Sequence, residues 1–115
     1  GLGLIPGRVK KFDFSKIENP PPIPHIGWNN ITGKRSLWDC SLLRRNRLDD
    51  SVYFVHSYVI EPEDTSIVLA TTRYGSIDFP SVVRLDNITA FQFHPEKSGE
   101  NGLCIYSEIA EAIRV

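Results

Sequence analysis

The chain has 115 residues, which is enough for one domain built around one hydrophobic core. Its 13 basic and 14 acidic side chains give a net charge of −1, so it lacks the basic excess expected of a nucleic-acid-binding domain or of a polybasic protein that binds membranes. No apolar run approaches the length of a membrane span.

The two cysteines, Cys40 and Cys104, lie far apart in the sequence and match no metal-binding spacing. We therefore expect no metal site and no cofactor, and a reduced, cytoplasmic environment.

The start of the chain suggests a position inside a domain. Residues 1–7 are glycine-rich, as in a connection between two elements, and the whole chain has no methionine. A processed or tag-cleaved start is the alternative.

The first half of the chain predicts few regular elements. Residues 8–14 alternate loosely between basic and apolar side chains, which is typical of a short exposed strand. The prolines at 20–22 end any regular element, because they fix φ and remove backbone donors. The remaining expectations are an extended segment over 23–28, a turn over 29–34, a strand or short helix over 37–43, and a solvated loop over 44–50.

The second half predicts strands followed by one helix. β-Branched and aromatic residues favour strands over 52–60, 67–72, 82–85 and 88–93. After Ser98 and Gly99, apolar residues at helical spacing predict a helix that packs on the sheet through Leu103, Tyr106, Ile109, Ala110 and Ile113. We expect an α/β domain, rich in strands, in which at least one sheet face needs a further cover.

His94 and Glu96 follow the last predicted strand and lie two residues apart, on one face of an extended segment. A carboxylate beside an imidazole can hold its tautomer and stabilise its protonated form, as a general base serving a nucleophile requires. So short a motif is weakly specific, and a turn before a capped helix is the alternative. The apolar strand before it, the proline within it and the helix after it favour a ligand site.

The nucleophile that would complete this pair is a cysteine on a sharp, glycine-flanked turn from strand to helix. Cys40 lacks the glycines, and Cys104 lies on the predicted terminal helix. We therefore expect that neither is the nucleophile and that the chain alone is inactive.

Two further clusters combine strand ends with polar groups. His56 is by itself more typical of a structural histidine, but Ser57 and Tyr58 beside it make a ligand-binding edge credible. Trp28 beside Asn29 fits a contact surface or a core position about equally well.

These clusters, in this order, resemble the glutaminase subunits of imidazole glycerol phosphate synthase, which are class I glutamine amidotransferases. His-Pro-Glu at 94–96 marks the class, whereas Gly-Trp-Asn and Phe-Val-His-Ser-Tyr narrow the match to this type of subunit. The similar segments are 1–7, 24–29, 53–58, 70–75 and 91–98, and residues 37–50 match less well.

The resemblance implies a Cys-His-Glu glutaminase that releases ammonia to a barrel-shaped cyclase subunit for histidine biosynthesis. It implies His94 as the base and Glu96 as its orienter. The glutamine-binding residues would be His56, Ser57 and Tyr58, and the partner-facing residues would be Trp28, Asn29, Tyr53 and Lys97.

The resemblance covers only the C-terminal half of a three-layer amidotransferase domain. Residues 1–115 are therefore expected to form a partial domain that lacks the N-terminal half with the nucleophile, and to self-associate. Two alternatives remain open. One is a related subunit that supplies ammonia for nucleotide-sugar or surface-polysaccharide synthesis, and the other is a non-catalytic interaction module.

Overall fold

The computed structural model describes residues 5–113, so residues 1–4 of the glycine-rich start lie outside the described part. The described strands are β1 (Gly7–Lys11), β2 (His25–Asn30), β3 (Thr32–Gly33), β4 (Ser51–His56), β5 (Tyr58–Pro62), β6 (Val68–Tyr74), β7 (Ile77–Leu85) and β8 (Ile88–Phe91). The helices are α1 (Arg35–Trp38) and α2 (Gly99–Ala112), with single 3-10 turns η1 (Thr65–Ile67) and η2 (Pro95–Lys97).

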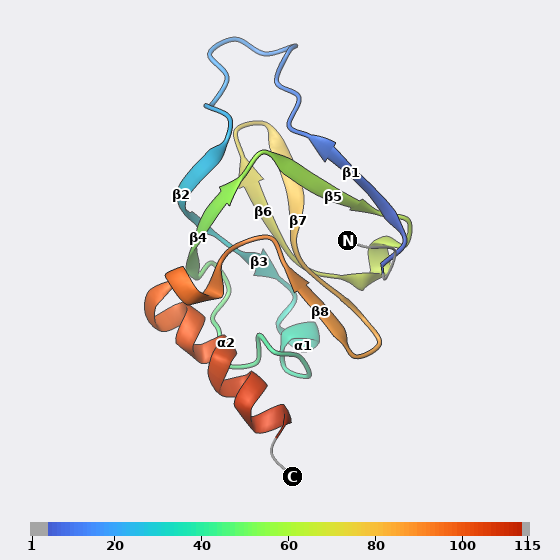
Figure 1. The fold of residues 1–115 in the computed structure, drawn as a ribbon, viewed down its shortest axis with the longest axis vertical. Coiled ribbons are helices and arrows are strands. Elements are labelled where there is room, and N and C mark those ends of the chain that lie inside the picture. Colours follow the sequence, from blue (N-terminus) through green and yellow to red (C-terminus); the bar gives the residue numbers. More distant parts are fainter. Residues whose placement is uncertain (1–4, 114–115) are drawn as a thin grey trace.

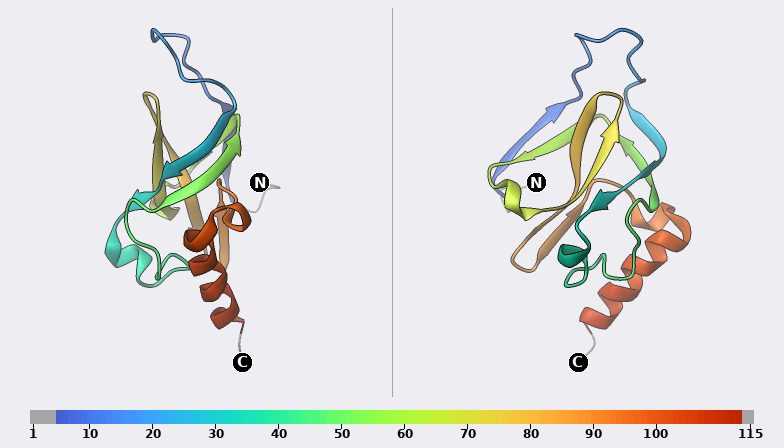
Figure 2. Two further views of the ribbon diagram at one scale, coloured as in Figure 1. Left: turned by 90° about the vertical axis from the view of Figure 1, so that its left-hand side faces the viewer. Right: turned by 180° about the vertical axis from the view of Figure 1, so that it is seen from behind.

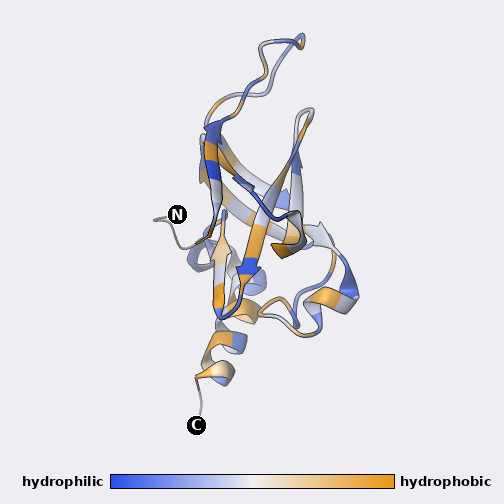
Figure 3. Ribbon diagram, turned by 90° about the vertical axis from the view of Figure 1, so that its right-hand side faces the viewer, coloured by the Kyte–Doolittle hydropathy of each residue, from blue (hydrophilic) through white to orange (hydrophobic). Residues whose placement is uncertain are grey.

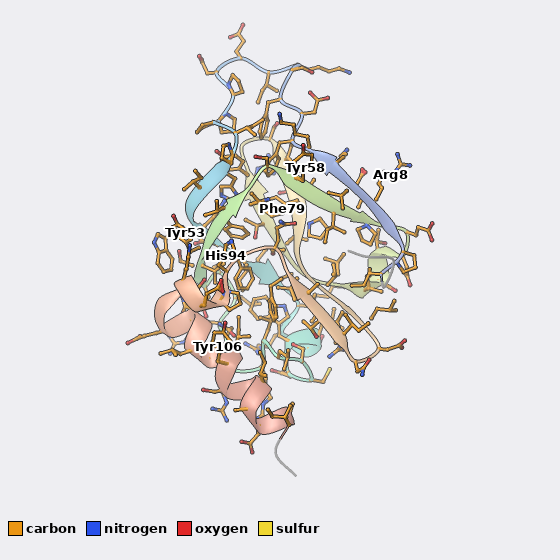
Figure 4. All side chains as sticks on the ribbon, viewed as in Figure 1. Arg8, Tyr53, Tyr58, Phe79, His94 and Tyr106 are labelled. Atoms are coloured by element: carbon orange, nitrogen blue, oxygen red, sulfur yellow. The ribbon has the colours of Figure 1, made fainter. Side chains whose placement is uncertain are left out.

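Antiparallel pairing joins the described strands into three sheets. β1 pairs with β5, β2 pairs with β4, and a four-stranded sheet has the order β3-β6-β7-β8. The sheets surround one core, in which the Phe79 ring lies centrally (Figures 1 and 4). The segment between β1 and β2 projects beyond the strands, and α2 extends away at the other end (Figure 2). The expected strand-rich α/β architecture with a C-terminal helix is confirmed.

The strand predicted over 52–60 is interrupted at Ser57, so the prediction of one element was wrong. β4 pairs with β2, whereas β5 pairs with β1, and the chain changes partner between them. The Ser57 carbonyl accepts a hydrogen bond from the Phe12 N–H at 3.1 Å. The break places His56 and Tyr58 at the ends of two different ladders.

The turn predicted over 29–34 was also wrong, because Asn29 and Asn30 end β2 and the Thr32–Gly33 pair forms β3. Gly33 is required there, since a Cβ on it would lie 2.6 Å from Nε1 of Trp38. That indole is fully buried and donates to the Leu69 carbonyl at 2.7 Å. The alternatives for 37–43 were a strand and a short helix. Residues 37 and 38 are helical, because α1 extends over Arg35–Trp38, and the rest of the segment lies beyond that helix.

Helix α2 forms as predicted, but of the predicted stripe Ile109 alone packs against the core, and it is only partly buried. Leu103, Tyr106 and Ile113 are 63%, 43% and 74% exposed, and the buried residues are Gly102, Ile105 and Glu108. The packed face carries a carboxylate because Glu108 is paired with Arg44 at 3.3 Å and Arg45 at 2.6 Å. Hydrophobic residues therefore recur along α2 without a cover from the described residues (Figure 3).

The outer face of β2 and β4 is apolar and exposed as well. Ile26 faces Val55 across the ladder, Trp28 faces Tyr53, and Ile26, Val55 and Trp28 are all exposed. Trp28 is 56% exposed, so it lies at the surface and not in the core, which was the other alternative. The expectation of an uncovered sheet face thus holds for the described residues.

Candidate active site

The His94 backbone lies where the chain crosses from one ladder to another. After β8, the Gln92 N–H still donates to Ser81 of β7 at 2.8 Å, whereas the His94 N–H donates to Tyr53 of β4 at 2.9 Å. Pro95 then begins η2, because the fixed φ of a proline suits the first position of a helix. The His94 side chain stands at this junction, beside Tyr53 and the start of α2 (Figure 4).

His94 and Glu96 are hydrogen-bonded, with Nδ1 of the ring 2.8 Å from Oε1 of the carboxylate. A hydrogen bond from its own backbone N–H lowers the pKa of Glu96, and His94 and Lys97 lower it further. The ionised carboxylate can only accept, so Nδ1 carries the proton. Within residues 5–113 no side chain bonds to Nε2 of His94. The side chains of His94 and Glu96 are both about half-exposed. This arrangement leaves Nε2 available to accept a proton.

Ser98 and Gly102 fix the turn that carries the pair. The buried Ser98 hydroxyl donates to the His94 carbonyl at 2.7 Å and accepts from the Tyr53 N–H at 3.0 Å. Gly102 passes so close to η2 that a Cβ on it would overlap the Pro95 carbonyl. Neither role was predicted from the sequence. Ser98 stands where a helix cap is expected, but its hydroxyl bonds backward to the strand end instead of to the helix.

His56 uses both ring nitrogens within the protein. Nδ1 lies 3.0 Å from the Tyr58 carbonyl, and Nε2 lies 2.8 Å from Nδ1 of His25. Burial lowers the pKa of His56, and the nearby His94 lowers it further. Burial also lowers the pKa of His25 to about 4, with a smaller contribution from His56. Both rings are therefore neutral at pH 7, and Tyr58 is exposed beside them.

The four residues expected to face a partner divide into two groups. Trp28 and Tyr53 form an edge-to-face pair with ring centroids 6.0 Å apart, and Lys97 is exposed on η2. Asn29 points to the opposite side of β2, where its amide donates to the Arg73 carbonyl at 2.9 Å. His25 was not singled out as a site residue, because its pairing with His56 joins positions 31 residues apart.

Neither cysteine lies in this site. The exposed Cys40 donates to the Leu37 carbonyl at 3.5 Å and lines a separate cavity of about 550 Å³ together with Arg84. Cys104 is half-buried on α2. In the described part of the chain no group of side chains has the composition of a metal site. No helix among the described residues is both long and apolar enough to span a membrane.

Comparison with known proteins identifies the family. The model of the family "Glutamine amidotransferase class-I" matches residues 9–105. Among curated relatives named "Imidazole glycerol phosphate synthase subunit HisH", the one from Leptospira borgpetersenii is 43% identical over 110 residues, which are 96% of this chain and 52% of the relative. The relative from Aquifex aeolicus is 46% identical over 103 residues, which are 90% of this chain and 45% of the relative. The relative from Methanocaldococcus jannaschii is 43% identical over 114 residues, which are 98% of this chain and 53% of the relative.

The chain therefore spans about half the length of the curated relatives that it matches. Since the family model covers most of the sequence, including the His94–Glu96 pair, the chain belongs to the class I glutamine amidotransferase family.

Proposed function

We propose that this chain is the part of a glutamine-hydrolysing subunit of imidazole glycerol phosphate synthase that supplies the general base and its orienter. The main support for this proposal is the 2.8 Å contact between Nδ1 of His94 and Glu96, which leaves Nε2 of the ring available to accept a proton. The names of relatives 43% and 46% identical support this synthase, and thus histidine biosynthesis, over nucleotide-sugar or polysaccharide synthesis.

The proposed reaction uses His94 twice. Nε2 of His94 takes the proton of a cysteine thiol, and the thiolate attacks the side-chain amide carbon of glutamine. His94 gives this proton to the leaving nitrogen, and the tetrahedral adduct collapses to a thioester as the C–N bond breaks and ammonia departs. Nε2 then takes a proton from the water that attacks the thioester and returns it to the sulfur as the C–S bond breaks, which releases glutamate and restores the thiol. Glu96 keeps the Nδ1 proton in place throughout.

The attacking thiolate is neither Cys40 nor Cys104, because both lie outside the site. We assign the thiolate to the half of the domain that the relatives have in addition to the matched residues. That half would carry the glycine-flanked turn. The 115 residues alone should therefore not hydrolyse glutamine.

The glutamine substrate would lie against residues 56–58. Because both ring nitrogens of His56 are engaged, we assign its direct contacts to Ser57 and the exposed Tyr58, with His56 holding the segment. Trp28, Tyr53 and Lys97 would meet the barrel-shaped cyclase subunit, because they share the exposed surface around η2 and β4. Asn29 would contribute from the end of β2.

The test compares two nitrogen sources in a subunit of full family length that carries this sequence, assembled with its synthase subunit. His94→Ala should abolish product formation from glutamine and leave product formation from ammonium salts unchanged, because the acceptor chemistry needs ammonia from any source. Ser107→Ala, at an exposed position of α2, is the matched control. Equal losses with both nitrogen sources would show that His94 is structural.

A further inference from the structure

The edge of β4 that faces away from β2 is bonded to the residues at the start of α2. The His94 N–H donates to the Tyr53 carbonyl at 2.9 Å, and the Tyr53 N–H donates to the Ser98 hydroxyl at 3.0 Å. Further along the same edge, Nδ2 of Asn101 donates to the Ser51 carbonyl at 2.8 Å. Because alternate residues of a strand present their backbone groups on the same edge, these bonds attach the start of α2 along one side of β4.

The Ser98 hydroxyl is at the centre of this attachment. It accepts from the Tyr53 N–H and donates to the His94 carbonyl at 2.7 Å, and that carbonyl also accepts from the Lys97 N–H at 3.0 Å. Ser98 is 1% exposed, so bulk water cannot readily replace a lost hydroxyl. The hydroxyl therefore connects the backbone of the 94–98 turn to the backbone of β4.

The direction of the His94 ring depends on this backbone. The side chain is 41% exposed, and within residues 5–113 its one side-chain hydrogen bond goes to Glu96, at 2.8 Å. Because Glu96 belongs to the same turn, the pair moves with the turn as one unit. The carboxylate thus sets the tautomer of the ring, whereas the attachment of the turn to β4 sets the position of Nε2.

We propose that Ser98 is a positioning residue whose hydroxyl holds the His94 backbone so that Nε2 faces the attacking thiol. This inference rests on the proposed function. A misplacement of about 1 Å at a reacting group can cost on the order of a hundredfold in rate. The glutamine contacts assigned to Ser57 and Tyr58 lie outside the 94–98 turn, so loss of the hydroxyl should act on kcat and not on the KM for glutamine.

Asn101→Ala is the matched control for Ser98→Ala. Both substitutions remove a hydrogen bond between the start of α2 and β4, but Asn101→Ala leaves both bonds of the Ser98 hydroxyl in place. The backbone carbonyl of Asn101 also keeps its bond from the Asn46 amide at 2.9 Å. Ser98→Thr retains a hydroxyl that can donate and accept, so it tests whether that group restores the rate.

The experiment measures kcat and KM in a subunit of full family length that carries this sequence, assembled with its synthase subunit. With glutamine, Ser98→Ala should lower kcat on the order of tenfold or more and change the KM by less than about twofold. Asn101→Ala and Ser98→Thr should keep kcat near that of the unmodified enzyme, and synthesis from ammonium salts should stay unchanged in all three. Urea unfolding of the same samples shows that each variant is folded.

Equal kcat values in folded Ser98→Ala and Asn101→Ala would overturn the inference, and so would a folded Ser98→Thr as slow as Ser98→Ala. If Ser98→Ala does not fold, Ser98→Cys replaces the hydroxyl by a weaker donor and acceptor and should lower kcat in the same way. An unchanged kcat in Ser98→Cys would again overturn the inference.

The positioning role and the proposed function fail on different results. A normal kcat in Ser98→Ala, together with an inactive His94→Ala, would refute only the positioning role. Survival of glutamine-driven synthesis in His94→Ala would instead refute the proposed function.

Discussion

Gly102 of α2 lies directly against the carbonyl of Pro95, the residue between His94 and Glu96, and a Cβ at position 102 would overlap that oxygen. The helix therefore approaches η2 as closely as its backbone allows. This contact fixes the turn on which both side chains of the candidate site stand.

Gly102→Ala should destabilise the protein by about 1–3 kcal/mol, although alanine favours a helix interior by about 1 kcal/mol over glycine. The overlap with the Pro95 carbonyl involves backbone on both sides, so no side chain can turn away to relieve it. Urea unfolding measures the effect. Leu103→Ala, at the exposed neighbouring position, should change the free energy of unfolding much less. Equal stability of Gly102→Ala and the unmodified protein would contradict this close contact.

Ser98→Ala should lower the free energy of unfolding by about 1–3 kcal/mol, because it leaves the Tyr53 N–H without its acceptor inside the protein. The substitution also removes the donor to the His94 carbonyl. Ser107→Ala makes the same chemical change at an exposed position of α2 and should be nearly neutral. Chemical unfolding of the two variants side by side is the measurement, and similar small effects would show that the Ser98 hydroxyl is dispensable.

The sequence predicted those features that depend on neighbouring residues. β-Branched and aromatic side chains predicted β6, β8 and the end of β7, whose first residues at 77–81 were missed, and the helical spacing after Gly99 predicted α2. The position of His94 beside Glu96 also followed from local geometry, because two residues separate them along an extended segment.

The sequence could not predict features that depend on distant partners. The buried face of α2 was predicted wrongly because Arg44 and Arg45, more than 60 residues before Glu108, make that carboxylate compatible with burial. The break at Ser57 was missed because β4 and β5 pair with different strands.

The stability of the fold should fall as the pH is lowered from about 6.5 to about 4. The pKa of His25 is about 4 in the folded protein and near 6.5 in the unfolded chain. Between these values the unfolded chain binds the proton and the folded protein does not, so acid favours unfolding, by about 3 kcal/mol over the whole interval. The lowered pKa of His56 acts in the same direction.

Urea unfolding at pH 7, 5.5 and 4 measures this slope. His25→Phe keeps the ring stacked between Tyr74 and Phe54 but cannot titrate, so its stability should change less over the same interval. An identical pH dependence in His25→Phe would assign the acid sensitivity to other groups.

The 115-residue chain by itself should self-associate, because apolar residues are exposed on two surfaces. One is the face of α2 with Leu103 and Tyr106, and the other is the outer face of β2 and β4 with Ile26 and Val55. Sedimentation or light scattering over a range of concentrations measures the mass. Leu103→Lys and Ile26→Lys each place a charge on one surface and show which of them mediates association. A strictly monomeric chain with a sharp thermal transition would contradict the prediction.

Glu96→Ala should be a milder lesion than His94→Ala in a subunit of full family length that carries this sequence. His94 would move protons at the sulfur and at the leaving nitrogen, so its loss removes a contribution of about 10² to 10⁴ in rate. Glu96 would only hold the tautomer and stabilise the charged ring. Its carboxylate is half-exposed, so water can occupy its place beside Nδ1.

Triads generally keep more activity without the orienting acid than without the base, and we expect Glu96→Ala to be at least about tenfold faster than His94→Ala with glutamine. Steady-state rates with glutamine and with ammonium salts decide the matter. If Glu96→Ala were as slow as His94→Ala with glutamine, the carboxylate would have a direct part in the chemistry instead of an orienting one.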